Sequence, residues 1–288
     1  MFHQKYQSYL DLIEDCLIHL PFTDNLICQS MNYSLVGGGK RVRPVLALAC
    51  VEIVGERPEN FVREAAALEL IHTYSLIHDD LPAMDNDDFR RGKPSNHKAF
   101  GEAAAILAGD ALLTFAFEML SQSLEIGPEK QLRVIRETAQ ASGWQGMVGG
   151  QVLDTVGNGQ KSGLKEIESI HRMKTGALLT ASARLGAILG GGTEEEIQCL
   201  SKYASYLGLA FQIKDDILDI VGESQILGKP ARSDEKLQKP TYPAILGLQG
   251  ADDCLKRTIA SAKDAIGYFG FKAEFLSELA DYVGKRDH

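Results

Sequence analysis

Long segments with apolar residues every three or four positions make up much of this chain. The segments 102–124, 129–151 and 193–222 are each too long for strands and are rich in good helix formers. Thr193, followed by three glutamates, is typical of a helix start. Regular alternation of apolar and polar residues between turn signals is essentially missing. The sequence therefore predicts a nearly all-helical, all-α fold.

Several of these segments are apolar on more than one face, as the segment 177–191 is. A helix of this kind usually lies at the centre of a large bundle or at an oligomer interface. No Ser- or Pro-rich linker, low-complexity stretch or repeat divides the chain. We therefore expect a single helical domain over 1–288, with its irregular segments at 83–98, 156–163 and 222–241.

Composition excludes several classes of protein. The chain has 30 Lys and Arg against 39 Asp and Glu, a net charge of −9, which disfavours a nucleic-acid partner. Its five cysteines are scattered and form no C-x-x-C pair, as in a reduced, cytoplasmic protein. The N-terminal residues lack the features of a signal or transit peptide. No apolar run approaches the roughly 18–20 residues of a membrane span, so none is expected.

Two acidic clusters each follow an apolar helical stretch. The first contains Asp79, Asp80 and Asp85, and the second contains Asp215, Asp216 and Asp219. Asp215 and Asp219 are four residues apart, on one face of a helix, where like charges repel. A hard dication relieves that repulsion, and Mg²⁺ usually binds through one or two carboxylates plus substrate phosphates. Either cluster alone is more often a solvated helix face; two together favour a metal site.

The first cluster is less regular than the second. Asp79 and Asp85 are six residues apart, which on an ideal helix points them to different sides. Pro82 between them removes a hydrogen bond and crowds the preceding turn. We therefore expect the helix to end or bend there and Asp85 to return in a loop.

A basic segment, Gly37–Pro44 (GGGKRVRP), places glycines before three cations. Glycines let backbone amides approach an oxyanion, and arginine binds phosphate through two parallel hydrogen bonds. The segment is equally compatible with a helix start that carries surface charge. Further candidate phosphate contacts, each alone more often solvated, are Lys174 with Thr175, Lys229 and Lys239. Together the acidic and basic groups indicate a cavity for an amphiphilic ligand with a polyanionic head and an apolar tail.

At this point the motifs HDDLPAMD, DDFRRGKP, GGGKRVRP, MKTGAL and FQIKDDILD resemble those of the short-chain trans-prenyl diphosphate synthases of bacteria and plastids. The resemblance runs from about residue 37 to about residue 248, with the motifs in the expected order. It is closest to the bacterial farnesyl diphosphate synthases. It implies a helical bundle around a deep central cavity, across which the two aspartate motifs face each other. It also implies a homodimer.

The resemblance further implies roles for individual residues. The ligands of three Mg²⁺ ions would be Asp79, Asp80, Asp85, Asp215, Asp216 and Asp219. Isopentenyl diphosphate would contact Lys40, Arg43, His72 and Arg91, and Gly39 would be a further substrate-binding residue. The allylic diphosphate would contact Arg90, Lys174, Thr175, Gln212, Lys229 and Lys239. Gln151 and Asp154 match a further motif of the family, whose role is left open.

The same resemblance implies a reaction. Ionisation of an allylic diphosphate, condensation with isopentenyl diphosphate and loss of a proton would give the longer product and pyrophosphate. Polar groups of Lys174, Thr175 and Gln212 could stabilise the allylic cation. The loop after Lys229 departs from the family pattern, because it reads Ala231–Asp234 where the family usually has Gly-x-Asp.

Product length is expected to depend on the helix before Asp79. One helical turn rises about 5.4 Å, comparable to one isoprene unit. Tyr74, five residues upstream and beside Ser75, is placed to be the floor of the cavity. In the family an aromatic residue here, with two inserted residues such as Pro82 and Ala83, is typical of farnesyl (C15) synthases. Plain core packing of Tyr74 is the alternative interpretation, and both roles can hold together.

The sequence is also compatible with other functions. The same reaction could stop at C10 or continue to C20. A terpene cyclase would not need the second diphosphate site that GGGKRVRP and Arg91 provide. A non-catalytic subunit of a heteromeric synthase tends to lose an aspartate motif, whereas both are complete here.

Overall fold

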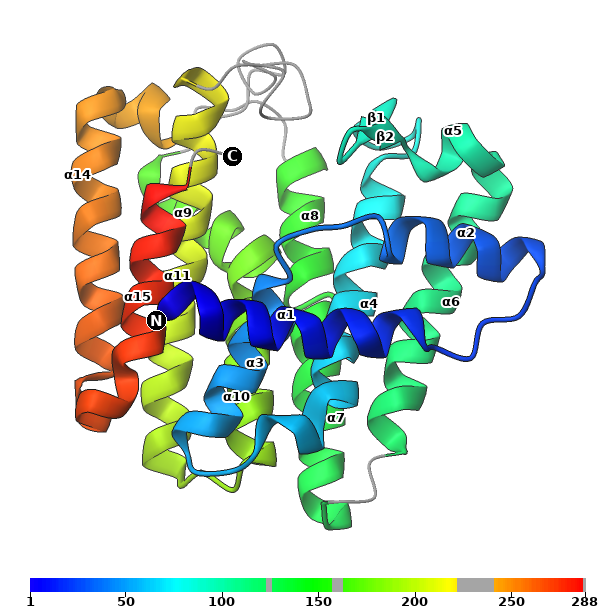
Figure 1. The fold of residues 1–288 in the computed structure, drawn as a ribbon. Coiled ribbons are helices and arrows are strands. Elements are labelled where there is room, and N and C mark those ends of the chain that lie inside the picture. The colour runs from blue at the N-terminus through cyan, green and yellow to red at the C-terminus, as the bar shows by residue number, and fades with distance from the viewer. Residues whose placement is uncertain (123–125, 157–162, 222–240, 287–288) are drawn as a thin grey trace.

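A computed structural model describes residues 1–122, 126–156, 163–221 and 241–286 of the chain (Figure 1). The helices are α1 (Phe2–Ile18), α2 (Leu26–Leu35), α3 (Val42–Ile53), η1 (Pro58–Phe61), α4 (Val62–Asp79), α5 (Asn96–Phe100), α6 (Glu102–Ser121), α7 (Pro128–Ser142), α8 (Met147–Val156), α9 (Leu164–His171), η2 (Arg172–Gly176), α10 (Ala177–Leu189), α11 (Glu194–Val221), α14 (Tyr242–Ala265), η3 (Gly267–Ala273) and α15 (Glu274–Lys285). Within these ranges the strands are a two-residue antiparallel pair, β1 (Phe89–Arg90) and β2 (Lys93–Pro94). The all-helical prediction is confirmed.

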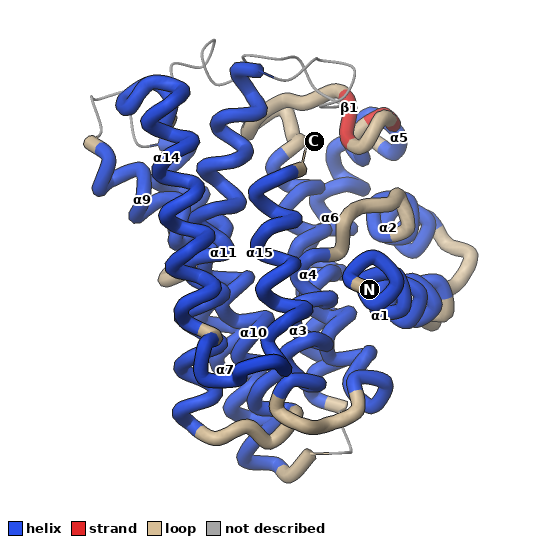
Figure 2. Tube along the Cα trace, turned by 60° about the vertical axis from the view of Figure 1, so that its left-hand side comes forward, coloured by secondary structure: helices blue, strands red, loops and turns tan. Residues whose placement is uncertain are grey.

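The long helices stand side by side, and α1 lies across them (Figures 1 and 2). In the bundle, α10 packs against α11, α3 and α7, and α4 packs against α6 and α3. The segment 177–191 is central, as predicted, because α10 is buried on all sides. Its approach to α3 depends on Gly186, where a Cβ would lie 2.0 Å from the Ala47 carbonyl oxygen. One cluster of buried apolar side chains runs from α1 to α15.

The prediction of one helix over 129–151 is wrong. The segment forms two helices, α7 and α8, which are separated at 143–146. Gly143 takes an extended backbone and ends α7. At Gly146 a Cβ would lie 2.0 Å from the carbonyl oxygen of Ala141, so the turn between the helices closes only on a residue without a side chain. This break directs α8 towards η2, against which it packs.

Of the helices that the structure describes, α6 alone is long and apolar enough to cross a membrane. A core helix of a soluble protein meets the same criterion, so one such helix is only weak evidence for a membrane span. α6 packs tightly on α4 through Gly109, where a Cβ would lie 2.1 Å from Nε2 of His78. That contact fixes the end of α4, from which the first acidic cluster begins.

Candidate active site

One cavity of about 1030 Å³ opens between the ends of the long helices. Its lining contains the following residues that the sequence singled out: Gly39, Lys40, Arg43, His72, Tyr74, Ser75, Asp79, Asp85, Arg90, Arg91, Gln151, Asp154, Lys174, Thr175, Gln212, Asp215, Asp216 and Asp219. Lys229, Lys239 and the departure at 231–234 lie outside the described residues. The cavity therefore brings together motifs that are far apart in the sequence.

The first acidic cluster forms where α4 ends. The helix stops at Asp79, and the chain folds back so that the Asp85 N–H donates to the Asp79 carbonyl oxygen at 2.9 Å. Asp85 thus returns in a loop after the helix, as expected, and the carboxylates of Asp79 and Asp85 both line the cavity. Burial raises the pKa of Asp79 to about 6; Lys174 opposes the rise and Asp85 adds to it. A carboxylate in this environment favours binding of a cation.

Asp80 lies differently from its neighbours. It is 2% exposed, is absent from the lining of the cavity and accepts hydrogen bonds from Arg90, one of them from Nε at 3.0 Å. Asp87 lies 3.4 Å from Nη2 of the same guanidinium. The structure therefore places Asp80 where it orients Arg90, rather than beside the cavity where we expected a metal ligand.

The second acidic cluster lies in the last turns of α11. Asp215, Asp216 and Asp219 all line the cavity. Asp216 is buried and accepts the N–H of Tyr242 at 2.9 Å, which ties α11 to the start of α14. Asp215 accepts from Gln212 at 2.9 Å and from Nη2 of Arg286 at 2.6 Å. The sequence did not point to Arg286, since it stands at the C-terminus outside every motif.

The basic side of the cavity is formed by Lys40, Arg43 and Arg91. Burial, with a contribution from Arg286, lowers the pKa of Lys40 to about 8. Burial lowers the pKa of Arg43 to about 10. The pKa of His72 falls well below its usual value because of burial and the surrounding arginines, so His72 is neutral near pH 7. These groups are desolvated cations and a neutral hydrogen-bonding ring, a suitable set for a polyanion.

Lys174 and Thr175 lie on η2, a π-helical turn between α9 and α10. π-Helical turns are rare in proteins, and many of those that occur are at functional sites. α8 contacts this turn closely, since a Cβ at Gly150 would lie 2.3 Å from the Lys174 nitrogen. On the same helix Asp154 accepts from Lys174 Nζ at 2.7 Å. The motif that contains Gln151 and Asp154 thus contacts Lys174, through the backbone at Gly150 and through the ion pair with Asp154.

Tyr74 is on α4 in the wall of the cavity. It is 6% exposed and packs edge-to-face against His78, with ring centroids 5.7 Å apart. His78 in turn lies 3.0 Å from the Ile106 carbonyl oxygen of α6. The hydroxyl of Ser75 donates to the His72 carbonyl at 2.8 Å, so it is engaged with its own helix. Tyr74 is therefore a buried residue of the cavity wall whose ring is packed against His78.

The donor set at the acidic side suits magnesium. Asp79, Asp85 and Asp215 offer only carboxylate oxygens, which a hard dication prefers. Within the described residues no three His, Cys, Asp or Glu side chains come close enough to hold a metal by themselves. Magnesium typically binds in this way, with substrate phosphates and water as its remaining ligands. The residues present therefore fit Mg²⁺ that binds together with a diphosphate.

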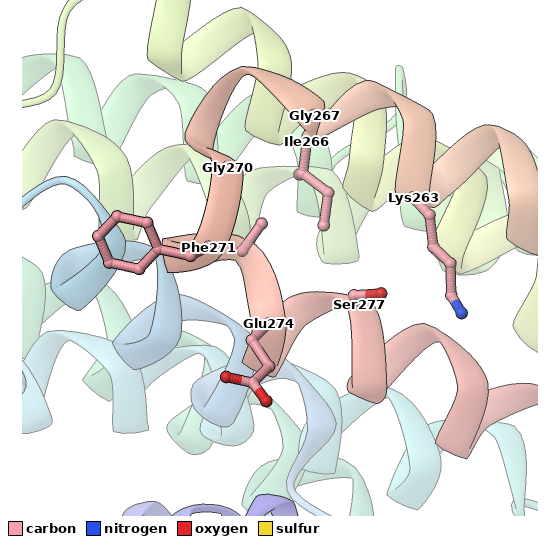
Figure 3. Close-up of a pocket in the computed structure, with 8 residues that line it drawn as sticks. Lys263, Ile266, Gly267, Gly270, Phe271, Glu274 and Ser277 are labelled. Carbon is pink, nitrogen blue, oxygen red and sulfur yellow. The ribbon is translucent and has the colours of Figure 1, made fainter.

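A second pocket of about 430 Å³ lies between the end of α14, η3 and α15 (Figure 3). It contains Lys263, Phe271 and Glu274, and Lys263 is paired with Asp281 at 2.6 Å. None of the residues that the motifs singled out lines it. The large cavity is thus the candidate active site.

The large cavity is lined by the carboxylates of both acidic clusters, by several cations and by apolar side chains such as Leu179. These features define an all-helical enzyme of the isoprenoid synthase class, which handles amphiphilic diphosphates. The sequence profile described as polyprenyl synthetase matches residues 24–267. The chain belongs to the polyprenyl synthetase family of prenyltransferases.

Relatives and solved structures agree with that assignment. The chain is 48% identical to a farnesyl diphosphate synthase from Geobacillus stearothermophilus over 90% of this chain and 88% of the relative. It is also 48% identical to a chloroplastic geranylgeranyl pyrophosphate synthase from Capsicum annuum, covering 92% of this chain and 72% of that protein. The crystal structure of an FPP/GFPP synthase from Zymomonas mobilis superposes with a TM-score of 0.84 at 37% identity, covering 98% of each chain.

Proposed function

We propose that the protein condenses isopentenyl diphosphate with dimethylallyl and then geranyl diphosphate, giving (E,E)-farnesyl diphosphate and pyrophosphate. The observation that carries this proposal is the composition of one cavity, which holds carboxylates of two acidic clusters, several cations and a buried tyrosine. The carboxylates suit one diphosphate through metal, and Lys40, Arg43 and Arg91 suit a second diphosphate. Two diphosphate sites in one cavity are what a condensation needs and a cyclisation does not.

The residues then have distinct roles in the reaction. Lys174, held by Asp154, and Arg90, held by Asp80, bind the allylic diphosphate as its C1–O bond breaks and the electron pair leaves with pyrophosphate. Three Mg²⁺ ions, bound through Asp79, Asp85 and the second cluster, would supply charge stabilisation of that leaving group. Thr175 and Gln212 also line the cavity, and their oxygens would stabilise the positive charge that develops on the allylic carbon.

The double bond of isopentenyl diphosphate then attacks C1, and a proton leaves to the departing pyrophosphate. The apolar wall of the cavity excludes water, which would otherwise quench the cation. Lys40, Arg43, His72 and Arg91 hold isopentenyl diphosphate so that its double bond faces the allylic carbon. No side chain in the cavity has to act as the base.

A C15 product is favoured over C20 by Tyr74, since its ring is buried and fixed against His78. Both farnesyl and geranylgeranyl synthases are 48% identical to the chain, so overall identity does not decide between them. The test is product analysis after incubation of the purified protein with isopentenyl diphosphate, Mg²⁺ and either allylic primer. Farnesol after dephosphorylation from both primers supports the proposal, and geranylgeraniol as main product contradicts the C15 step. If no product forms and EDTA does not change binding of the diphosphate substrates, the proposal that the protein is an enzyme is contradicted.

We further propose that the chain acts as a single domain in a cytoplasmic homodimer. The support is α6, whose Ile106 and Leu107 are 43% and 58% exposed on a strongly apolar helix. A second copy packed on α6 would cover them. The five cysteines are free, as in a reducing compartment. Light scattering should give twice the chain mass for the wild type and the monomer mass for Leu107→Glu; a monomeric wild type contradicts the dimer.

A further inference from the structure

The cations on the basic side of the cavity enclose a carboxylate, Glu69. It belongs to α4, its side chain is 1% exposed, and it lines the same cavity as Lys40, Arg43 and Arg91. An anion inside a site for an anionic ligand repels that ligand, more strongly where water is excluded. Coulomb repulsion alone predicts that the site would bind a diphosphate better without Glu69. Its presence therefore needs a second physical reason.

Glu69 contacts two arginines from distant parts of the chain. Its Oε1 accepts a hydrogen bond from Nη1 of Arg41 at 2.6 Å and lies 3.7 Å from Nη2 of Arg91. Arg41 precedes α3 in the glycine-rich loop, and Arg91 follows β1. One carboxylate oxygen thus joins the glycine-rich loop to the turn between β1 and β2.

Both arginines have a left-handed backbone, with φ of 49° at Arg41 and 53° at Arg91. This conformation is unfavourable for residues other than glycine. Among the described non-glycine residues only Asn86 shares a positive φ. Such conformations persist where the surroundings fix them and are frequent at functional sites. Glu69 is the contact that the two arginines share.

The two arginines depend on Glu69 to different degrees. Arg41 also donates to Glu14 Oε1 at 2.8 Å and to the Leu35 carbonyl at 2.6 Å. Within the described residues, Arg91 has a single ion pair, and its partner is Glu69. The guanidinium of Arg91 lies directly on the glycine-rich loop, where a Cβ at Gly39 would come within 2.8 Å of its Cζ. Glu69 also attracts Arg43 through its charge, but of the two arginines that it contacts, Arg91 is the one with no second ion pair among the described residues.

We propose that Glu69 is a positioning residue for the isopentenyl diphosphate site and acts by holding Arg91 against the glycine-rich loop. The inference rests on the proposed function, since it takes the anion bound by Lys40, Arg43 and Arg91 to be isopentenyl diphosphate. Positioning of Arg91 outweighs the repulsion that the carboxylate itself exerts on the ligand.

The two physical effects predict opposite results for Glu69→Gln, which keeps the shape of the side chain and removes its charge. If positioning dominates, KM for isopentenyl diphosphate rises about tenfold, while KM for geranyl diphosphate and kcat stay within twofold. If repulsion dominates, KM for isopentenyl diphosphate falls. An unchanged or lower KM for isopentenyl diphosphate in the folded variant overturns the proposal. A general loss of packing would instead change both KM values and kcat together.

The matched control is Glu14→Gln, because Glu14 pairs with Arg41 at a similar distance and acts on Arg91 only through a more distant charge interaction. Its KM for isopentenyl diphosphate should stay within threefold of the wild-type value. A double-mutant cycle with Arg91→Met tests the route: Glu69→Gln should have no further effect on KM once Arg91 is gone. Additive effects in that cycle would overturn the proposal.

Two measurements keep the outcomes separate. Wild-type turnover of geranyl diphosphate tests the proposed function independently of Glu69. If Glu69→Gln does not fold, as judged by circular dichroism, Glu69→Asp replaces it, since its shorter side chain keeps the charge but withdraws from Arg91. A wild-type KM for isopentenyl diphosphate in Glu69→Asp would overturn the positioning role.

Discussion

Replacement of Tyr74 by alanine should lengthen the product from C15 to C20. Tyr74 lies five residues before Asp79 on α4, about 7.5 Å along the helix axis. Its ring is buried and held against His78, so a longer chain cannot displace it without breaking that packing. Alanine at this position opens the cavity by roughly the depth that one more isoprene unit requires.

The magnitude follows from burial of the added unit. Five further carbons are stabilised by at most about 4 kcal/mol, at about 0.8 kcal/mol per buried CH₂. At about 1.4 kcal/mol per factor of ten, this favours occupancy by the longer chain up to roughly a thousandfold. C20 should therefore change from a trace to the main product. Loss of the buried ring should also lower the free energy of unfolding by about 3 kcal/mol.

The assay is chromatography of dephosphorylated products from geranyl diphosphate and isopentenyl diphosphate. Tyr74→Phe is the matched control, because it keeps the ring and removes only the hydroxyl, and it should still stop at C15. Unchanged C15 output from folded, active Tyr74→Ala would refute the reasoning, and Tyr74 would then be a core residue alone.

Three further perturbations have defined outcomes. Asp154→Asn removes the ion pair that holds Lys174. In steady-state assays kcat/KM for the allylic substrate should fall about tenfold, which corresponds to about 1.4 kcal/mol. An unchanged kcat/KM contradicts the role of Asp154 in positioning Lys174. Because the pKa of Lys40 is lowered to about 8, its ammonium is lost as the pH rises through 8, so KM for isopentenyl diphosphate should rise between pH 7 and 9.5. Lys40→Arg should give a flat profile, and the same rise in that variant would assign it to another group. Gly109→Ala forces a Cβ onto His78 and should lower the free energy of unfolding by about 1–3 kcal/mol in urea titrations, whereas wild-type stability would show that α4 and α6 separate easily.

Several parts of the site could be predicted from the sequence because they depend on local spacing. The end of α4 near Asp79 follows from Pro82 and the charges around it. The common face of Asp215 and Asp219 follows from the helical period alone. The same period predicted α6 and α11 nearly to their ends. These features need only the neighbouring residues, which the sequence provides directly.

Other features depend on contacts between residues distant in the sequence. The helical period continues through 129–151, but the break between α7 and α8 comes from the close approach of backbone at Gly146. Asp80 and Asp79 are adjacent, yet only Asp79 lines the cavity. The carboxylate of Asp80 is instead hydrogen-bonded to Arg90.

Local patterns in the sequence were enough to predict the class of fold, most of the helices and the acidic and basic motifs of the site, because periodicity and residue type are local properties. The pairing of side chains from distant parts of the chain depends on the packing of the helices. Arg286 reaches Asp215 across 71 positions, and Glu69 joins Arg41 to Arg91. A hydrogen bond or ion pair depends on distances of a few ångströms, and between distant residues those distances are set by how the helices pack.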